Sequence, residues 1–156
     1  MIVDKMSELR AAVPAGRRLI GLDLGTKTIG CALTDGGWMI ASPLVTLARK
    51  KKLAPTLAEL FALLDEREVG GIVLGLPINM DGTEGPRCQA TRAFAANLLA
   101  ARDMPLLFWD ERLSTAAVER MLIDADTTRK RRGELVDKLA ATYILQGALD
   151  AYERGG

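Results

Sequence analysis

Histidine does not occur anywhere in this sequence of 156 residues. Its absence excludes the commonest general base, Ser–His and Cys–His nucleophile pairs, and imidazole metal ligands. Only two cysteines are present, Cys31 and Cys88, which are too few and too isolated for a disulfide framework or a zinc site. We expect both to be buried thiols in a reducing compartment. Any catalysis must therefore use carboxylates, lysine, hydroxyl groups or thiols.

Long hydrophobic runs are also absent, because no apolar stretch approaches the roughly 18 residues that span a membrane. The N-terminal residues include Asp4 and Glu8 and lack the apolar core of a signal peptide. These observations predict a cytoplasmic protein with no membrane partner.

Neither sign of charge dominates, since 21 Lys and Arg residues oppose 20 Asp and Glu residues for a net charge of +1. A nucleic acid partner would therefore have to bind a local basic patch. Hydrophobic residues make up 49% of the chain and charged residues 26%, a balance typical of one soluble globular domain.

The chain divides into an N-terminal segment, residues 1–16, and a single domain, residues 17–156. The N-terminal segment has no sustained hydrophobic period, which predicts a loosely held tail or a short helix. Short apolar runs between turn residues predict five strands, at residues 19–24, 29–34, 40–47, 71–76 and 106–109. Helical spacing of apolar residues predicts helices near residues 55–64, 90–101, 115–123 and 134–152, with a basic loop at 129–132 before the last helix.

This order of elements predicts an α/β fold with a mixed five-stranded sheet. The first three strands are consecutive and joined by short turns, so we expect them to be antiparallel. The fourth and fifth strands follow helical crossovers, so we expect them to be parallel, with helices on both faces of the sheet.

Asp23 is the first of three acids that stand where a ligand could bind. In the first strand it lies on the opposite face from Ile20, Leu22 and Leu24. A carboxylate inside a central strand needs a cationic partner, and the neighbouring Gly21 leaves space for one to approach. Alternatively, Asp23 only caps the turn that follows.

Asp110 and Glu111 end the fifth strand, the position at which ligands usually bind in open α/β sheets. They point to opposite faces if the strand continues, so only one of them can enter a given site. Glu111 shares its face with Leu107 and Trp109. The pair could equally be solvated acids beside Arg112.

Asp137 begins an apolar stripe in the last helix, because Ala141, Ile144 and Ala148 follow it at helical spacing. It should face the sheet, although a first-turn acid can also merely stabilise the helix dipole, by about 0.3–1 kcal/mol. Carboxylates from a first strand, a later strand end and a final helix form a ligand set for Mg²⁺ or Mn²⁺. A pair of such ions can promote phosphodiester hydrolysis without histidine.

Basic residues gather in two runs, which hold eight of the 21 cationic residues: Arg49 to Lys52, and Arg129, Lys130, Arg131 and Arg132. They suffice for phosphate contacts, although such runs also occur as solvated loops that aid solubility. The loop at residues 81–86 either places backbone amides against a phosphate or is an ordinary turn. Lys27 either contacts the scissile phosphate or lies exposed in a hairpin turn.

Four motifs, in this order and in a chain of this length, closely resemble the YqgF/RuvX family. The resemblance covers nearly everything from Arg17 to Tyr152. The motifs are Leu22-Asp23-Leu24-Gly25-Thr26-Lys27-Thr28-Ile29-Gly30, Gly75-Leu76-Pro77-Ile78-Asn79-Met80-Asp81-Gly82-Thr83, Asp110-Glu111-Arg112-Leu113-Ser114, and Asp137-Lys138-Leu139-Ala140-Ala141 with Ile144-Leu145.

The resemblance implies a ribonuclease H-like fold, related to the RuvC Holliday-junction resolvases, and a nuclease that processes the 5′ end of the 16S ribosomal RNA precursor. It implies metal-binding, catalytic acids at Asp23, Glu111 and Asp137, with Lys27 and Arg112 contacting phosphate. Thr28 departs from the Arg that is frequent in the family.

RuvC relatives also have an acid at the end of the fourth strand, where this chain has Leu76-Pro77. The resemblance therefore implies that Glu111 replaces that acid.

Three functions compete for this sequence. The first is a metal-dependent endonuclease that acts on precursor rRNA as a monomer or weak homodimer. The second is a Holliday junction resolvase, which would need a dimer to hold two active sites on branched DNA. The third is a non-catalytic RNA-binding module. The pattern Asp-x-Gly-x-Lys-x-x-Gly also resembles the phosphate loop of actin-like ATPases, but those enzymes close two such domains over the nucleotide and 156 residues are too few.

Overall fold

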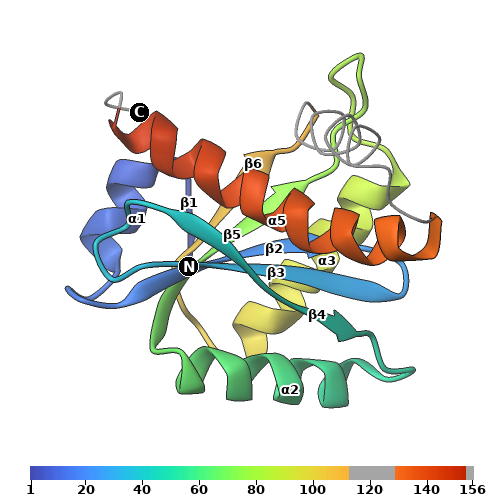
Figure 1. Cartoon of the computed structure of the whole chain (residues 1–156), viewed down its shortest axis with the longest axis horizontal. Coiled ribbons are helices and arrows are strands. Elements are labelled where there is room, and N and C mark those ends of the chain that lie inside the picture. Colours follow the sequence, from blue (N-terminus) through green and yellow to red (C-terminus); the bar gives the residue numbers. More distant parts are fainter. Residues whose placement is uncertain (113–128, 154–156) are drawn as a thin grey trace.

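A six-stranded mixed sheet runs through the middle of the molecule in the computed structural model, which describes residues 1–112 and 129–153, with side chains for 1–112 and 139–153 (Figure 1). The strand order is β1-β6-β5-β2-β3-β4. The strands are β1 (Ile2–Val3), β2 (Arg18–Leu24), β3 (Thr28–Thr34), β4 (Ala41–Ala48), β5 (Val69–Leu76) and β6 (Leu106–Asp110).

Strand directions agree with the prediction. β2, β3 and β4 form an antiparallel meander, whereas β5 is parallel to β2 and β6 is parallel to β5. The α/β class and the five predicted strands are confirmed, and β1 is an additional strand that pairs in parallel with β6.

Helices cover both faces of the sheet (Figure 1). They are α1 (Met6–Ala12), α2 (Leu53–Glu66), α3 (Pro86–Ala101) and α5 (Arg129–Glu153). α1 and α5 pack against one core cluster, and α2 and α3 against the other. The helix predicted at residues 115–123 lies outside the described residues.

The predicted basic loop at residues 129–132 is wrong, because these residues form the beginning of α5. Arg and Lys have high helix propensities, so a run of them continues a helix as readily as it forms a loop. Their side chains lie outside the described residues.

Residues 1–16 belong to the sheet and to the core, contrary to the expectation of a loosely held tail. β1 occupies one edge of the sheet beside β6, and Met6 and Leu9 of α1 are almost completely buried. The N-terminal ammonium group of Met1 also donates a hydrogen bond to Asp103. The short-helix alternative holds for α1, but a two-residue strand has no period that a sequence pattern can reveal.

β2 separates the two halves of the core as its alternation predicts. Ile20, Leu22 and Leu24 pack in the cluster shared with α2 and α3. Gly21 lies on the opposite face, where a Cβ would be 2.8 Å from the Cβ of Leu145 in α5. Because only glycine fits at that distance, α5 can cross closely over the strand that carries Asp23.

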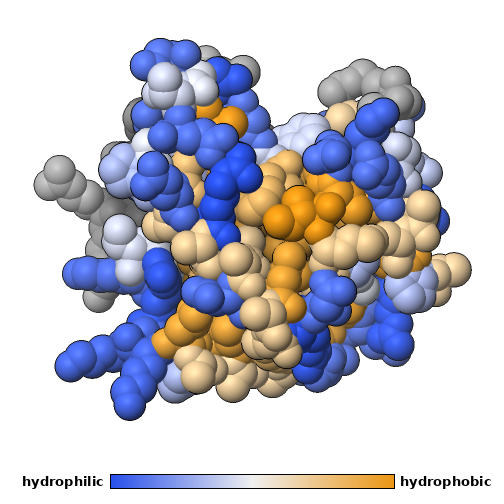
Figure 2. Space-filling view, turned by 180° about the vertical axis from the view of Figure 1, so that it is seen from behind, coloured by the Kyte–Doolittle hydropathy of each residue, from blue (hydrophilic) through white to orange (hydrophobic). Residues whose placement is uncertain are grey.

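Seen from behind, hydrophobic side chains form patches in the middle of the molecule and hydrophilic ones surround them (Figure 2). Several hydrophobic residues, including Phe61, Leu99 and Phe108, are only partly buried where they pack against the core cluster that contains α2 and α3. In the part of the chain that the structure describes, no helix combines the length and apolar character needed to span a bilayer.

Candidate active site

Asp23 and Glu111 form a carboxylate pair at the ends of two strands. Asp23 is near the end of β2, Glu111 directly follows β6, and their side chains share a hydrogen bond. β5 lies between β2 and β6, and its Gly75 is paired with Trp109 near the end of β6. A Cβ at Gly75 would collide with the Glu111 carboxylate and with Ile144 of α5. The missing side chain at Gly75 therefore makes the room in which Glu111 lies.

The structure distinguishes the two adjacent acids at the end of β6. Glu111 turns toward Asp23, whereas the Asp110 carboxylate accepts hydrogen bonds from Arg112, at 2.8 Å from Nε and 3.0 Å from the backbone nitrogen. Burial alone would raise the pKa of Asp110, but the hydrogen bonds and charge of Arg112 lower it below its ordinary value. The solvated-acid alternative thus describes Asp110, and Glu111 is the acid that joins Asp23.

Burial raises the pKa of Glu111 to about 7, and the negative charge of Asp23 adds to the shift. The positive charge of Arg87 acts in the opposite direction. Two carboxylates at hydrogen-bond distance cannot both be ionised cheaply unless a proton or a cation lies between them. Their oxygen atoms are the donors that Mg²⁺ and Mn²⁺ prefer, so the pair fits a divalent metal ion.

Asp137, the third predicted acid, is in α5 one helical turn before Ala141, and its side chain lies outside the described residues. The apolar stripe that it begins is confirmed, since Ala141, Ile144 and Ala148 are fully buried. Within residues 1–112 and 139–153, no three metal-ligating side chains come together. The described site therefore supplies two acids, with Asp137 as the predicted third.

A cavity of about 390 Å³ opens beside Glu111. It is lined by residues 77–80, residues 85–87, Glu111 and Arg112. This volume lies in the range of small-molecule and cofactor sites. Two guanidinium groups, those of Arg87 and Arg112, thus share a cavity with one carboxylate of the acid pair, an arrangement suited to an anionic group.

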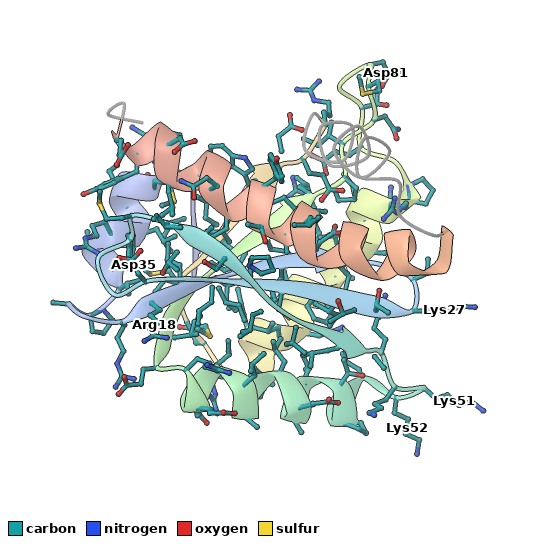
Figure 3. All side chains as sticks on the ribbon, in the orientation of Figure 1. Arg18, Lys27, Asp35, Lys51, Lys52 and Asp81 are labelled. Atoms are coloured by element: carbon teal, nitrogen blue, oxygen red, sulfur yellow. The ribbon has the colours of Figure 1, made fainter. Side chains whose placement is uncertain are left out.

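The loop at residues 79–83 is a tight turn, and its first two residues, Asn79 and Met80, line the cavity. The backbone nitrogen of Asn79 donates to the carbonyl of Thr83 at 2.9 Å, and that of Gly82 donates to the carbonyl of Asn79 at 2.8 Å. Asp81, at the tip of the loop in Figure 3, accepts a hydrogen bond from the Thr83 nitrogen at 2.9 Å. Within the predicted loop at residues 81–86, the amides of Gly82 and Thr83 are thus occupied in the turn, so this part fits the ordinary-turn alternative.

The predicted basic residues are not all at the cavity. Arg112 lines it, whereas Lys27 lies in the turn between β2 and β3 and points away from the molecule (Figure 3). The side chains of Arg129, Lys130, Arg131 and Arg132 lie outside the described residues.

Arg87 is a site residue that the sequence analysis missed. It is in the first turn of α3, lines the cavity and acts electrostatically on Glu111. The signal was available, because Pro86 after Gly85 marks a helix start that follows a buried strand. A cation in that first turn lies beside the carboxyl end of β5.

The fold defines this protein as an α/β protein with the same fold as RuvC. RuvC from T. thermophilus, in complex with a Holliday junction substrate, superposes with a TM-score of 0.54 at 14% identity, covering 90% of this chain and 96% of that chain. Another structure of T. thermophilus RuvC superposes with a TM-score of 0.53 at 14% identity, covering 88% of this chain and 96% of that chain. At this identity the likeness establishes the fold, which confirms the predicted ribonuclease H-like class.

The chain belongs to the RuvX family, whose model is described as Holliday junction resolvase and matches residues 17–151. A relative from Rhodospirillum rubrum named "Putative pre-16S rRNA nuclease" is 62% identical over 155 residues, 99% of this chain and 96% of the relative. Two further relatives have the same name. The one from Paramagnetospirillum magneticum is 58% identical over 92% of each chain, and the one from Ruegeria pomeroyi is 56% identical over 96% of this chain and 97% of the relative. The predicted family membership is confirmed.

Proposed function

We propose that this protein is a metal-dependent endonuclease that hydrolyses a phosphodiester bond at the 5′ end of precursor 16S rRNA. The observation that carries the chemistry is the Asp23–Glu111 pair, a partly buried pair of acids beside a cavity that contains two arginines. The substrate class follows from the names of the relatives. Such a substrate places the protein in the cytoplasm, as the sequence predicts.

Asp23, Glu111 and Asp137 would hold Mg²⁺ or Mn²⁺. When bound, the ions would activate a water molecule and stabilise the developing negative charge on the phosphate. The residues of the chain orient these groups: Gly75 leaves room for Glu111, and Ile144 of α5 packs against the same place. Asp137 is on the same helix as Ile144. The packing of α5 against the sheet would therefore place Asp137 relative to Glu111.

Arg87 and Arg112 would bind the phosphate group that is cut. The Arg112 guanidinium is held by Asp110 through Nε and Nη2, which fixes its orientation toward the cavity. A guanidinium has five N–H donors, so a group held through two of them retains donors for a phosphate oxygen. Arg129, Lys130, Arg131 and Arg132 would add contacts to the same substrate from the start of α5.

A Holliday junction resolvase is the second candidate function. The description of the family and the T. thermophilus RuvC complex favour it. A resolvase must place two active sites on one junction, so it would act as a dimer. We expect a monomer or weak homodimer, and cleavage by a strict monomer would argue for the RNA substrate.

The test compares the wild type with Asp137→Asn and Glu111→Gln for cleavage of precursor rRNA and of a synthetic four-way junction. Each reaction is run with Mn²⁺ and with a chelator, and folding is checked by circular dichroism. We expect metal-dependent cutting of the RNA that both substitutions abolish. Glu8→Gln, which neutralises an exposed acid of α1, is the matched control and should cut normally.

Three outcomes would contradict the proposal. Cutting of the junction alone would identify a resolvase, and cutting that persists in chelator would exclude a metal mechanism. Binding of the RNA without any cutting would leave the non-catalytic RNA-binding module.

A further inference from the structure

Three lysines gather at one end of the molecule, away from the cavity. Lys27 comes from the β2–β3 turn, and Lys51 and Lys52 come from the loop between β4 and α2. Figure 3 shows all three side chains extending into solvent at that end, whereas Arg18 lies at the other. We call Lys27, Lys51 and Lys52 the lysine platform.

Hydrogen bonds join the two loops of the platform. The backbone nitrogen of Arg49 donates to the carbonyl of Lys27 at 2.8 Å, and its guanidinium donates to the carbonyl of Gly25 at 2.6 Å. The nitrogen of Lys50 donates to the Thr56 hydroxyl at 2.8 Å, which fixes the loop to the first turn of α2. The lysines are therefore presented by one connected surface, not by two independent loops.

The charges of the platform are not neutralised within the described residues. None of the three lysines is in an ion pair there, whereas the adjacent Lys50 lies 3.7 Å from Glu59. The first turn of α2 contains no acidic residue, so the positive end of that helix adds to the same field. Three other described cations are in ion pairs, as Arg92–Glu84, Arg102–Asp65 and Arg112–Asp110. Lys5, Arg17 and Arg67 are also in no ion pair among the described residues, but they lie beside separate elements.

The position of the platform relates it to the carboxylate pair. Asp23 lies on β2 and Lys27 lies four residues later, in the turn that ends this strand. Leu24 pairs with Ile29 and the Gly25 nitrogen donates to the Thr28 carbonyl, so the hairpin reverses after Thr26, three residues beyond Asp23. A strand advances about 3.4 Å per residue, so the platform begins roughly 10 Å beyond Asp23. A nucleic-acid strand that continues from the acid pair along the direction of β2 would therefore reach the platform within a few nucleotides.

We propose that the lysine platform binds the phosphate backbone of the substrate RNA a few nucleotides from the bond that is cut. The proposal rests on the proposed nuclease function for the identity of the substrate. It gives Lys27 a different role from the one predicted, because Lys27 contacts the flanking strand and not the scissile phosphate. The platform is a positioning surface, which sets where the strand lies relative to Asp23 and Glu111.

The test measures binding of a fluorescent 16-nucleotide single-stranded RNA by anisotropy, in chelator, over a series of salt concentrations. The triple variant Lys27→Ala, Lys51→Ala and Lys52→Ala should bind at least about tenfold more weakly at about 50 mM salt. Loss of three phosphate contacts should also reduce the log–log salt slope by about 2. The triple variant with arginine at the same positions keeps the charges and should restore both the affinity and the slope.

The matched control removes three exposed cations elsewhere, by Lys5→Ala, Arg17→Ala and Arg67→Ala. These positions precede α1, precede β2 and follow α2. We expect this control to bind like the wild type. A platform variant whose affinity and slope match those of the control would overturn the proposal, as would an arginine variant that fails to restore them.

Failure of the platform and failure of the nuclease function can be told apart. Binding is measured without metal, so a protein that never cuts RNA still tests the platform. Conversely, a wild type that cuts RNA while the platform variant keeps full affinity and slope would reject the platform alone.

Discussion

At the scale of single residues, Glu111 shows why the candidate site is costly without a cation. It is partly buried, its carboxylate meets that of Asp23, and the strand beneath it has no side chain at Gly75. Burial and the neighbouring carboxylate stabilise a neutral or metal-bound carboxyl group over a free carboxylate, and Gly75 leaves the room for it. These contacts determine how the stability of the protein depends on pH and what a larger residue at position 75 would do.

In chelator, the free energy of unfolding should fall as the pH rises from about 4.5 to about 7. The pKa of Glu111 is raised from 4.5 to about 7 in the folded protein, so the folded state binds more protons in this window. The stabilisation is complete below pH 4.5 and lost above about 7, a change of roughly 1–3 kcal/mol. Urea unfolding at several pH values measures it, and Glu111→Gln should lack this component. If the free energy of unfolding depended on pH in the same way in the wild type and in Glu111→Gln, the raised pKa would not belong to Glu111.

Gly75→Ala should disable the site by displacing Glu111. The new Cβ would collide with the Glu111 carboxylate and lie 2.5 Å from Cδ1 of Ile144, so we expect a loss of about 1–3 kcal/mol in stability. We also expect loss of RNA cleavage. Gly36→Ala is the control, because a Cβ there meets nothing closer than 4.0 Å. Thermal melts and cleavage assays compare the two variants, and normal cutting by Gly75→Ala would argue against this geometry.

At the scale of elements, the spacing of apolar residues predicted a helix best where one face of that helix is buried over several turns. The helix predicted near residues 55–64 is an example, since Leu57, Leu60 and Leu64 recur at helical spacing and are buried in α2, with Phe61 partly buried beside them. α3 was harder, because Ala90 and Ala101 are exposed while other positions of the helix face the core. Alanine fits either environment, so its spacing defines a face poorly.

The N-terminal elements provide a test of how much residues 1–16 contribute to the fold. Leu9→Ala should lower the free energy of unfolding by about 2–5 kcal/mol, because Leu9 is fully buried between α1 and the core. Glu8→Ala, on the exposed side of the same helix, should change it by less than about 0.5 kcal/mol. Chemical denaturation measures both, and equal stabilities would mean that this segment is a tail after all.

At the scale of the whole molecule, the site exists only because distant segments meet at one end of the sheet. β2 supplies Asp23, the end of β6 supplies Glu111, and α3 and the loop before it supply the cavity with Arg87. A metal ion bound there would connect segments that separate on unfolding, so it would stabilise the fold by linkage.

Mn²⁺ should therefore raise the melting temperature of the wild type. At a concentration about 100 times its dissociation constant, the ion should add about 2.7 kcal/mol of stability. Asp23→Asn should remove most of this effect, whereas Asp4→Asn, an exposed acid near the N-terminus, should keep it. Scanning calorimetry with and without Mn²⁺ gives the comparison, and equal stabilisation of both variants would place the ion elsewhere.

The sequence by itself determined the order of the described elements from β2 onward, the alternation of β2, the apolar stripe of α5 and the exclusion of histidine chemistry. These properties follow from local periodicity and composition, which depend on few neighbouring residues. The tertiary structure decided that Glu111 rather than Asp110 meets Asp23, that Arg87 joins the cavity and that Lys27 lies outside it. Those outcomes depend on strand register and on the packing of α5 over Gly21 and Gly75, which no local pattern encodes.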